Sequence, residues 1–294
     1  MSVARLGVLF ALCGGLACRS SPPAGFDGAA ASAFQRETTE QLRGESSPFS
    51  VVDAFYVGPG ETLRLVRVDR RARAIHEDAD DAVELAVGDA FECRKRCGDH
   101  LGAIEGPTSI PFGPLRLELA PQPVGDRAGG RVLVHDPEAE AFVAFARACE
   151  AGHNGCLNWF PVSEAMIVVA QLGASESTAI DLTTSRGLQK RFAIAGELRF
   201  ELGGQSHTLT AFRSEGAPAS EPMLVPFTDT TNGDSTYPVG RYLQVESDGA
   251  TAVIDFNRAT NPWCAYSPHY NCPVPPASNR LPIAIEAGER SFHP

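Results

Sequence analysis

The stretch "GELRFELGGQSHTLTAF" (residues 196–212) alternates apolar and polar residues on both sides of a Gly-Gly pair. The stretch "RYLQVESDGATAVIDF" (residues 241–256) repeats this plan around an Asp-Gly pair. Such alternation predicts β-strands with one buried face, and Gly-Gly and Asp-Gly supply the positive φ angles of two-residue hairpin turns. We therefore predict two hairpins, and their short spacing indicates a mainly β fold, an antiparallel sandwich or barrel-like sheets.

The first half of the chain carries further strand signals. "VVDAFYV" (51–57) and "TLRLVRV" (62–68) flank the turn sequence "GPGE", which predicts a strand, a turn and a second strand. "PLRLELA" (114–120) alternates apolar and polar residues. We expect it to pair with "GGRVLVHD" (129–136), which follows a loop that contains glycine. We expect the same antiparallel architecture in this half.

One or two short helices should interrupt the strands. "HDPEAEAFVAFARACEAG" (135–152) predicts a helix near residues 137–150, because its Asp-Pro start, its terminal glycine and its apolar residues at the helical period are typical of one. A short helical stretch is expected at 35–43 and a second short helix at 89–96. A long loop rich in proline and asparagine should follow at 255–282.

The N-terminus has the features of an export signal. A single basic residue precedes a short apolar run, which is far from the roughly 20 residues that a membrane-spanning helix needs. Small residues then lead to Cys18, so the segment resembles a bacterial lipoprotein signal. Residues 1–17 are then a removed signal peptide, and Cys18 anchors an exported protein in the cell envelope through its lipid chains. An ordinary secretory signal with a stray cysteine is the alternative.

Composition divides the mature chain into three parts. Residues 18–33 are small and polar and contain proline and glycine, as expected of a flexible, lipid-attached tether. Residues 34–155 form the expected N-terminal, mainly β part, which includes the helix near 137–150. Residues 156–294 form the expected C-terminal β domain.

The chain is acidic, with 25 basic and 36 acidic residues and a net charge of −11 at pH 7. Removal of the signal peptide takes away Arg5 and lowers the charge to −12. This charge argues against nucleic acid as a partner, since the two would repel each other. The sequence contains no phosphate loop, dinucleotide fingerprint or common hydrolase motif, so we expect no cofactor.

Six cysteines remain once Cys13 leaves with the signal peptide and Cys18 takes the lipid: Cys93, Cys97, Cys149, Cys156, Cys264 and Cys272. In an oxidising compartment, an even number that falls into three close pairs favours local disulfides. The second and third pairs are the most plausible bridges. The first pair is less suited, because positions i and i+4 of a regular helix do not give natural disulfide geometry.

A metal site is the sharper alternative for these cysteines. His153 lies within the second pair and His269 within the third. Structural zinc takes four nitrogen or sulfur ligands, whereas each group offers three and neither has paired C-x-x-C spacing. We therefore predict no metal, and free buried thiols remain open as a third possibility.

Three blocks in the last third of the chain carry a family likeness. They are "VPFTDTTNGDSTYPVGRYL" (225–243), "DFNRATNPWCAYSPHYNCPVPPASNRLP" (255–282) and "IEAGER" (285–290). In order and spacing they resemble the hallmark blocks of the bacterial and archaeal family catalogued as domain of unknown function 1684. The resemblance implies an envelope lipoprotein, because the family includes such proteins, and it implies no mechanism, because the family's activity is not established.

The polar side chains of these blocks are the candidate ligand-binding residues: Asp229, Tyr237, Arg241, Asp255, Asn257, Asn261 and Asn279. If they converge under the proline-rich loop, they form a cleft with carboxylates, a guanidinium and amide donors. The alternative is that they satisfy buried loop backbone, as aspartate and asparagine often do.

Two functions fit this pattern. The first is a non-catalytic envelope lipoprotein whose β domain binds a small polar ligand or an envelope protein at that cleft. The second is an enzyme, a hydrolase or lyase, in which Asp229 or Asp255 acts as a base and Arg241 holds an anionic substrate.

Overall fold

The computed structural model describes residues 28–292, except 124–126, 153–155 and 215. The predicted signal peptide and Cys18 lie outside this part of the chain. The predicted tether, residues 18–33, extends too far, because helix α1 (Gly28–Leu42) already begins at residue 28. No helix within the described ranges has the length and apolarity that a membrane crossing requires.

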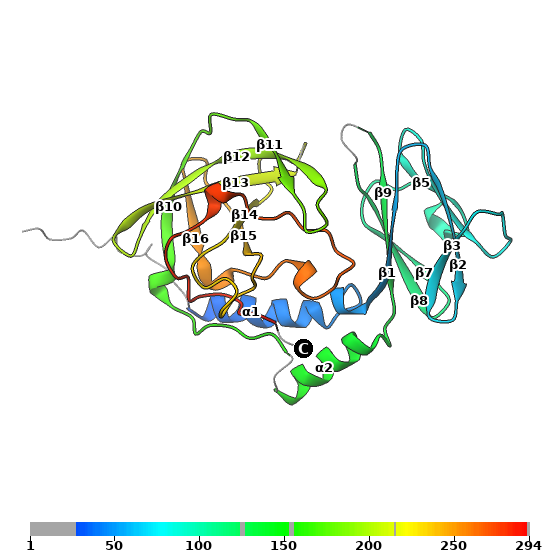
Figure 1. Ribbon diagram of the computed structural model, residues 1–294, viewed down its shortest axis with the longest axis horizontal. Coiled ribbons are helices and arrows are strands. Elements are labelled where there is room, and N and C mark those ends of the chain that lie inside the picture. Colours follow the sequence, from blue (N-terminus) through cyan, green and yellow to red (C-terminus); the bar gives the residue numbers. More distant parts are fainter. Residues whose placement is uncertain (1–27, 124–126, 153–155, 215, 293–294) are drawn as a thin grey trace, which may run out of the picture.

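Residues 51–135 form a unit of two antiparallel sheets (Figure 1). One sheet has the order β1 (Val51–Val57), β9 (Gly130–His135), β8 (Leu115–Pro121), β7 (Thr108–Phe112). The other has the order β3 (Arg71–Ile75), β2 (Thr62–Val68), β4 (Val83–Val87), β5 (Phe91–Lys95), β6 (Gly102–Ala103). Both sheets contribute to one apolar core, in which Leu65 and Leu85 of one sheet join Leu117 of the other. The unit is therefore a β-sandwich.

Residues 167–255 form a seven-stranded antiparallel sheet. Its order is β15 (Arg241–Val245), β14 (Met223–Phe227), β13 (Gln205–Ser214), β12 (Gln189–Leu202), β10 (Ile167–Gly173), β16 (Thr251–Asp255), with β11 (Ala179–Thr183) paired to β12. Only residues 246–250 join the edge strands β15 and β16. Such a link reaches at most about 20 Å, whereas the edges of a flat sheet of this order would lie about 24 Å apart. The sheet therefore curls into a half-open barrel.

A long irregular segment closes the open side of this half-barrel. Residues 256–292 contain only short 3-10 helices, and Phe256, Leu281 and Ile285 join the apolar core of the sheet. The 3-10 helices of the described residues are Pro48–Ser50, Gly98–His100, Glu164–Met166, Phe256–Arg258, Trp263–Ala265 and Ala277–Asn279. The predicted mainly β fold with a long Pro/Asn-rich C-terminal loop is thus confirmed.

Two of the predicted strand pairings are correct. Strands β12 and β13 pair as predicted, and their turn places Gly203 and Gly204 at φ angles of 63° and 76°. Strands β8 and β9 also pair as predicted.

Two other predicted pairings are wrong, although their strands exist. The strands of 241–256 lie at opposite edges of the sheet, where β15 pairs with β14 and β16 with β10. The strands at 51–57 and 62–68 belong to different sheets of the sandwich. In both cases alternation identifies a strand, while the turn sequence does not identify its partner.

The helix predicted near 137–150 is confirmed as α2 (Glu140–Ala151), which ends at Gly152 in the left-handed conformation. The helix predicted at 89–96 is wrong, because this segment contains strand β5, whose Phe91 and Cys93 are buried while Arg94 is exposed. The chain then turns at Arg96, which has a φ angle of 60°, and Cys97 returns to form a disulfide with Cys93. Helical spacing was the reason to doubt a disulfide between Cys93 and Cys97, and it does not apply to a strand followed by a turn.

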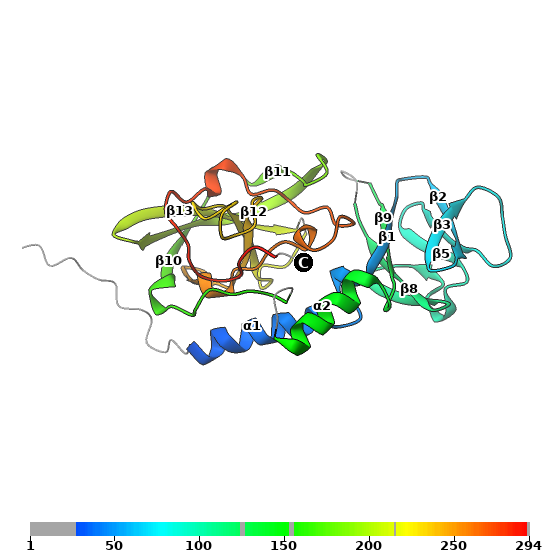
Figure 2. The ribbon, with the colours of Figure 1, turned by 60° about the horizontal axis from the view of Figure 1, so that its bottom comes forward.

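Helix α1 lies along the C-terminal unit rather than along the sandwich (Figure 2). Gln35 Nε2 donates to the carbonyl of Asn257 over 3.2 Å, and the Phe34 ring meets that of Trp159 edge to face. The predicted boundary between residues 155 and 156 therefore separates the two β units. It assigns α1 to the N-terminal part, although this helix packs on the C-terminal unit.

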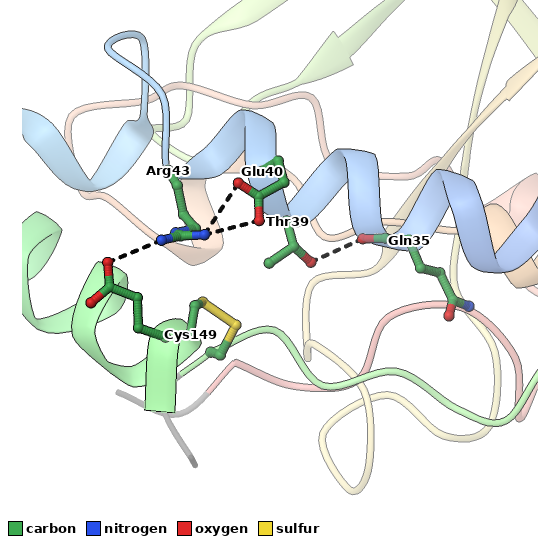
Figure 3. The surroundings of a disulfide bond; sticks show 7 residues. Gln35, Thr39, Glu40, Arg43 and Cys149 are labelled. Carbon is green, nitrogen blue, oxygen red and sulfur yellow. Dashed lines mark hydrogen bonds and ion pairs between the residues drawn. A yellow bond between two sulfur atoms is a disulfide. The ribbon is translucent and has the colours of Figure 1, made fainter. Parts of the chain in front are cut away.

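Helices α1 and α2 are joined to each other. Arg43, the residue after α1, contacts Glu40 of α1 at 2.9 Å and Glu150 of α2 at 3.1 Å (Figure 3). The neighbouring Cys149 forms the predicted disulfide with Cys156, with the two Cα atoms 4.7 Å apart. This bridge fixes the end of α2 beside the start of the C-terminal unit.

Candidate functional site

Arg241 and Asp229 form a buried ion pair. Arg241 Nη2 lies 2.9 Å from Asp229 Oδ2, and both side chains are fully shielded from solvent. The guanidinium also donates to the carbonyls of Ile285, Ala287 and Glu289. Burial lowers the pKa of Arg241, and the Asp229 carboxylate opposes this effect. The pair holds residues 285–289 against strand β15 and presents no group to a ligand.

Asn257 and Asn279 also bind main chain. Asn257 accepts from the Ser163 N–H over 2.8 Å and donates to the Ser163 carbonyl over 2.9 Å. Asn279 makes the same two-way contact with Thr210, at 2.8 Å each way, and donates to the carbonyl of Pro226. Both side chains are fully buried. Each amide therefore replaces the hydrogen bonds that a neighbouring strand would have supplied.

Asp255 contacts Asn257, and Tyr237 lies near Cys264. One carboxylate oxygen of Asp255 accepts from the N–H and the side-chain amide of Asn257. The hydroxyl of Tyr237 lies 4.0 Å from Cys264 Sγ. The seven polar side chains thus do not line one cleft, and most of them form hydrogen bonds with nearby main chain, as the alternative interpretation expects.

One predicted residue, Asn261, lines a pocket next to helix α1. The pocket has a volume of about 540 Å³ and lies between α1 and the loop 260–266. Its walls are Phe34, Thr38, Gln41, Leu42, Gly44, Glu45, Ser46, Thr260, Asn261, Trp263 and Tyr266. This volume is within the range of small-molecule sites.

Behind the pocket wall, Asn261 and Tyr266 contact the buried carboxyl of Glu289. Asn261 donates its N–H to Oε2 and its side-chain amide to Oε1, each over 2.8 Å, and the Tyr266 hydroxyl donates to Oε1. Burial raises the pKa of Glu289 to about 7, although these hydrogen bonds oppose the shift. The pKa of Tyr266 is raised well above its usual value by burial and by the adjacent carboxyl.

The side-chain oxygen of Asn261 has no hydrogen-bond partner. Its orientation is fixed, because the amide nitrogen donates to two acceptors, Glu289 Oε1 and the carbonyl of Arg290. A buried acceptor without a partner costs about 1–3 kcal/mol. The oxygen of Asn261 is therefore an unsatisfied acceptor that is closed off from solvent.

The chemistry of the pocket is aromatic and hydroxylic. Phe34, Trp263 and Tyr266 supply flat apolar surface, while threonine, serine and glutamine supply neutral hydrogen-bonding groups. Glu45 is its one charged side chain, and no Lys, Arg or His is among the lining residues. The pocket therefore suits a neutral or cationic polar molecule better than an anion.

The metal alternative has no support in the part of the chain that the structure describes. No group of three or more His, Cys, Asp or Glu side chains in those residues is placed to hold a metal ion. His153, one of the candidate ligands, lies outside them. The predicted bridge between Cys264 and Cys272 is also absent, and both residues are free thiols.

Several residues of this region were not among the predicted ones. Glu289 lies in the block "IEAGER", and no spacing rule marks it as buried. The pocket residues of α1 come from a segment more than 200 residues away from Asn261 in the chain. Only the tertiary fold brings them together.

Comparison with known proteins gives a family for the C-terminal unit. Residues 154–290 match the model of a family described as a protein of unknown function, DUF1684. The chain is also similar to an uncharacterized protein of Haloarcula marismortui with a solution NMR structure, at 39% sequence identity over 46% of this chain and 76% of that one, with a TM-score of 0.40. No curated protein matches the chain. Through its C-terminal unit, the chain belongs to the DUF1684 family.

Proposed function

We propose that the chain is an exported lipoprotein that binds a small, neutral polar ligand in the pocket between α1 and the loop 260–266. The observation that carries the proposal is the pocket itself, in which aromatic faces combine with neutral hydrogen-bonding groups. Sugars and other polyols have this chemistry, since they present hydroxyl groups and an apolar face that stacks on aromatic rings.

Burial argues against the hydrolase or lyase that uses Asp229 and Arg241. Both side chains are closed off from solvent and paired with each other, so neither can reach a substrate. Asp255 alone is partly exposed, and it caps the following 3-10 helix. The proposed function therefore rests on binding at the pocket.

Lipid attachment at Cys18 would hold this pocket near a membrane. Nine residues separate Cys18 from the start of α1, and this link spans at most about 35 Å. Because α1 forms one wall of the pocket, the ligand would be bound within a short distance of the envelope surface. Metabolic labelling with an alkyne fatty acid should label the wild type and not Cys18→Ser. An unlabelled wild type would favour an ordinary secretory signal.

Thermal unfolding in the presence of a sugar series tests the binding proposal. Hexoses should be compared with their amino and phosphate derivatives, which vary the charge at similar size. We expect at least one neutral or amino sugar to raise the Tm, and the phosphates to have no effect, because Glu45 repels anions.

Trp263→Ala should abolish this shift, and Tyr56→Ala is its matched control. The two aromatic side chains have similar exposure, 43% and 41%, but Tyr56 lies on the sandwich, outside the pocket. A sugar-induced shift that survives Trp263→Ala, or no shift with any sugar, contradicts the proposal.

A further inference from the structure

Cys264 and Cys272 are the two free thiols among the described cysteines. They are eight residues apart in the chain, yet the Cys264 N–H donates to Cys272 Sγ over 3.3 Å. The four other described cysteines form two disulfides. The described part of the chain therefore contains two disulfides and one adjacent pair of unbonded cysteines.

The surroundings hold both thiols in place. Cys264 belongs to the 3-10 helix Trp263–Ala265, and the Cys272 N–H donates to Ser185 Oγ over 3.1 Å. The next residue, Pro273, forms a β-bridge with Thr184. Both cysteines are half-buried, so a small reagent has access to the pair.

The two thiols differ in acidity. A hydrogen bond from Cys272 lowers the pKa of Cys264 to about 7, and contacts with Tyr237 and Ser185 act in the same direction. The pKa of Cys272 is raised, because its thiol donates that hydrogen bond to Cys264 and is buried. Lys190 is the nearby cation, and it opposes the shift of Cys272. At neutral pH, Cys264 is thus the better thiolate, and the thiolate is the nucleophile in disulfide chemistry.

We propose that Cys264 and Cys272 are a reactive dithiol that undergoes thiol–disulfide exchange with a low-molecular-weight disulfide. Cys264 Sγ attacks one sulfur of the disulfide, which forms a mixed disulfide and releases one thiolate. Cys272 then loses its proton to solvent and attacks Cys264 Sγ, which releases the second thiolate and closes the Cys264–Cys272 bond. Two protein thiols are oxidised and one small disulfide is reduced to two thiols.

The hydrogen bond between the pair suits this order of events. The Cys264 N–H already points at Cys272 Sγ, where negative charge develops in the second step. A donor at that position favours the anion. The backbone of Cys264 therefore assists the deprotonation of Cys272 in the second step.

The site lies at the junction of the two β units. Cys264 and Cys272 pack with Tyr270 against Val51 and Leu133, which belong to strands β1 and β9 of the sandwich. Formation of the Cys264–Cys272 bond therefore changes the packing of side chains between the two β units. Neither cysteine lines the ligand pocket, so the proposal does not depend on the proposed function.

Oxidised glutathione is the probe, applied to the gently reduced protein and followed by mass spectrometry. The wild type should form the Cys264–Cys272 bond and retain no glutathione. Cys272→Ser should retain one glutathione on Cys264, and Cys264→Ser should react at least about tenfold more slowly. Reaction of the two variants at equal rates overturns the assignment of roles, and no reaction in the wild type overturns the site.

Alkylation of the reduced wild type gives a test without substitutions. Limited iodoacetamide should label Cys264 before Cys272, with a midpoint near pH 7 rather than the usual value of about 8.5. Reduced glutathione should reopen the oxidised pair under native conditions. A bond that resists it, while the protein remains folded, is a structural disulfide and contradicts the proposal.

Discussion

The sandwich and the C-terminal unit stabilise their interiors in different ways. Among the described residues, the sandwich strands fully bury one polar side chain, His135, whereas the C-terminal unit buries several, including Asp229, Arg241, Asn261 and Glu289. The strands of the sandwich satisfy each other's backbone, while residues 256–292 cross the half-barrel without strands and need side chains to do so. A motif rich in Asp, Asn and Arg can therefore mark a segment that must be fixed in place.

The largest expected effect is at the buried ion pair. Arg241→Met removes the partner of Asp229 and leaves the carbonyls of residues 285–289 without donors, so the free energy of unfolding should fall by about 3–5 kcal/mol. Urea unfolding measures this loss. Arg199→Met, which removes an exposed contact with Glu197, is the control and should cost less than about 1 kcal/mol. Equal losses would show that the buried pair has no special role.

The sandwich should instead respond to loss of apolar volume. Leu117 is fully buried in its core, and Leu117→Ala should lower the free energy of unfolding by about 3 kcal/mol. Leu101→Ala is the matched control, because that leucine is 61% exposed and should change stability by less than about 0.5 kcal/mol. A small effect at Leu117 would mean that the two sheets do not share a tight core.

Local sequence predicted the elements better than their partners. Alternation in 241–256 correctly indicated two strands, but curling of the sheet, which depends on all seven strands, placed them at opposite edges. The segment 89–96 has no decisive period, and pairing with β4 made it a strand. The secondary-structure propensity of a segment cannot decide whether it is a helix or a strand in such cases, because the contacts that decide lie outside the segment.

The candidate site was harder to predict for a different reason. Asparagine has the same donors and acceptors whether it binds a ligand or a backbone, so Asn257 and Asn261 look alike in the sequence. Their surroundings separate them: Asn257 binds both main-chain groups of Ser163, while the oxygen of Asn261 has no partner. Such a distinction depends on neighbours nearly 100 residues away in the chain.

The pH dependence of stability should distinguish the two regions. Because burial raises the pKa of Glu289 to about 7, the folded state binds more protons than the unfolded state between about pH 4.5 and pH 7. The contribution of Glu289 is therefore complete at low pH and is lost as the pH rises through 7, by about 3 kcal/mol at most. Urea unfolding from pH 4.5 to 8 should show this decline in the wild type and a flatter profile in Glu289→Gln. Parallel profiles would exclude a buried, protonated Glu289.

Glu118 of the sandwich should give the smallest effect, with the opposite sign. His135, 3.7 Å away, and the guanidinium of Arg131, at 2.9 Å, hold the pKa of Glu118 below its usual range despite burial. A lowered pKa means that the stabilisation is present above the unfolded value of about 4.3 and is lost as the pH falls through the folded value. Glu118→Gln should cost on the order of 1 kcal/mol at pH 7 and reduce the sensitivity of unfolding to acid. If Glu118→Gln instead flattened the dependence of stability on pH above pH 5, the pKa of Glu118 would not be lowered. The sandwich would then not be stabilised by an ionised carboxylate, and its contrast with the protonated Glu289 of the C-terminal unit would be lost.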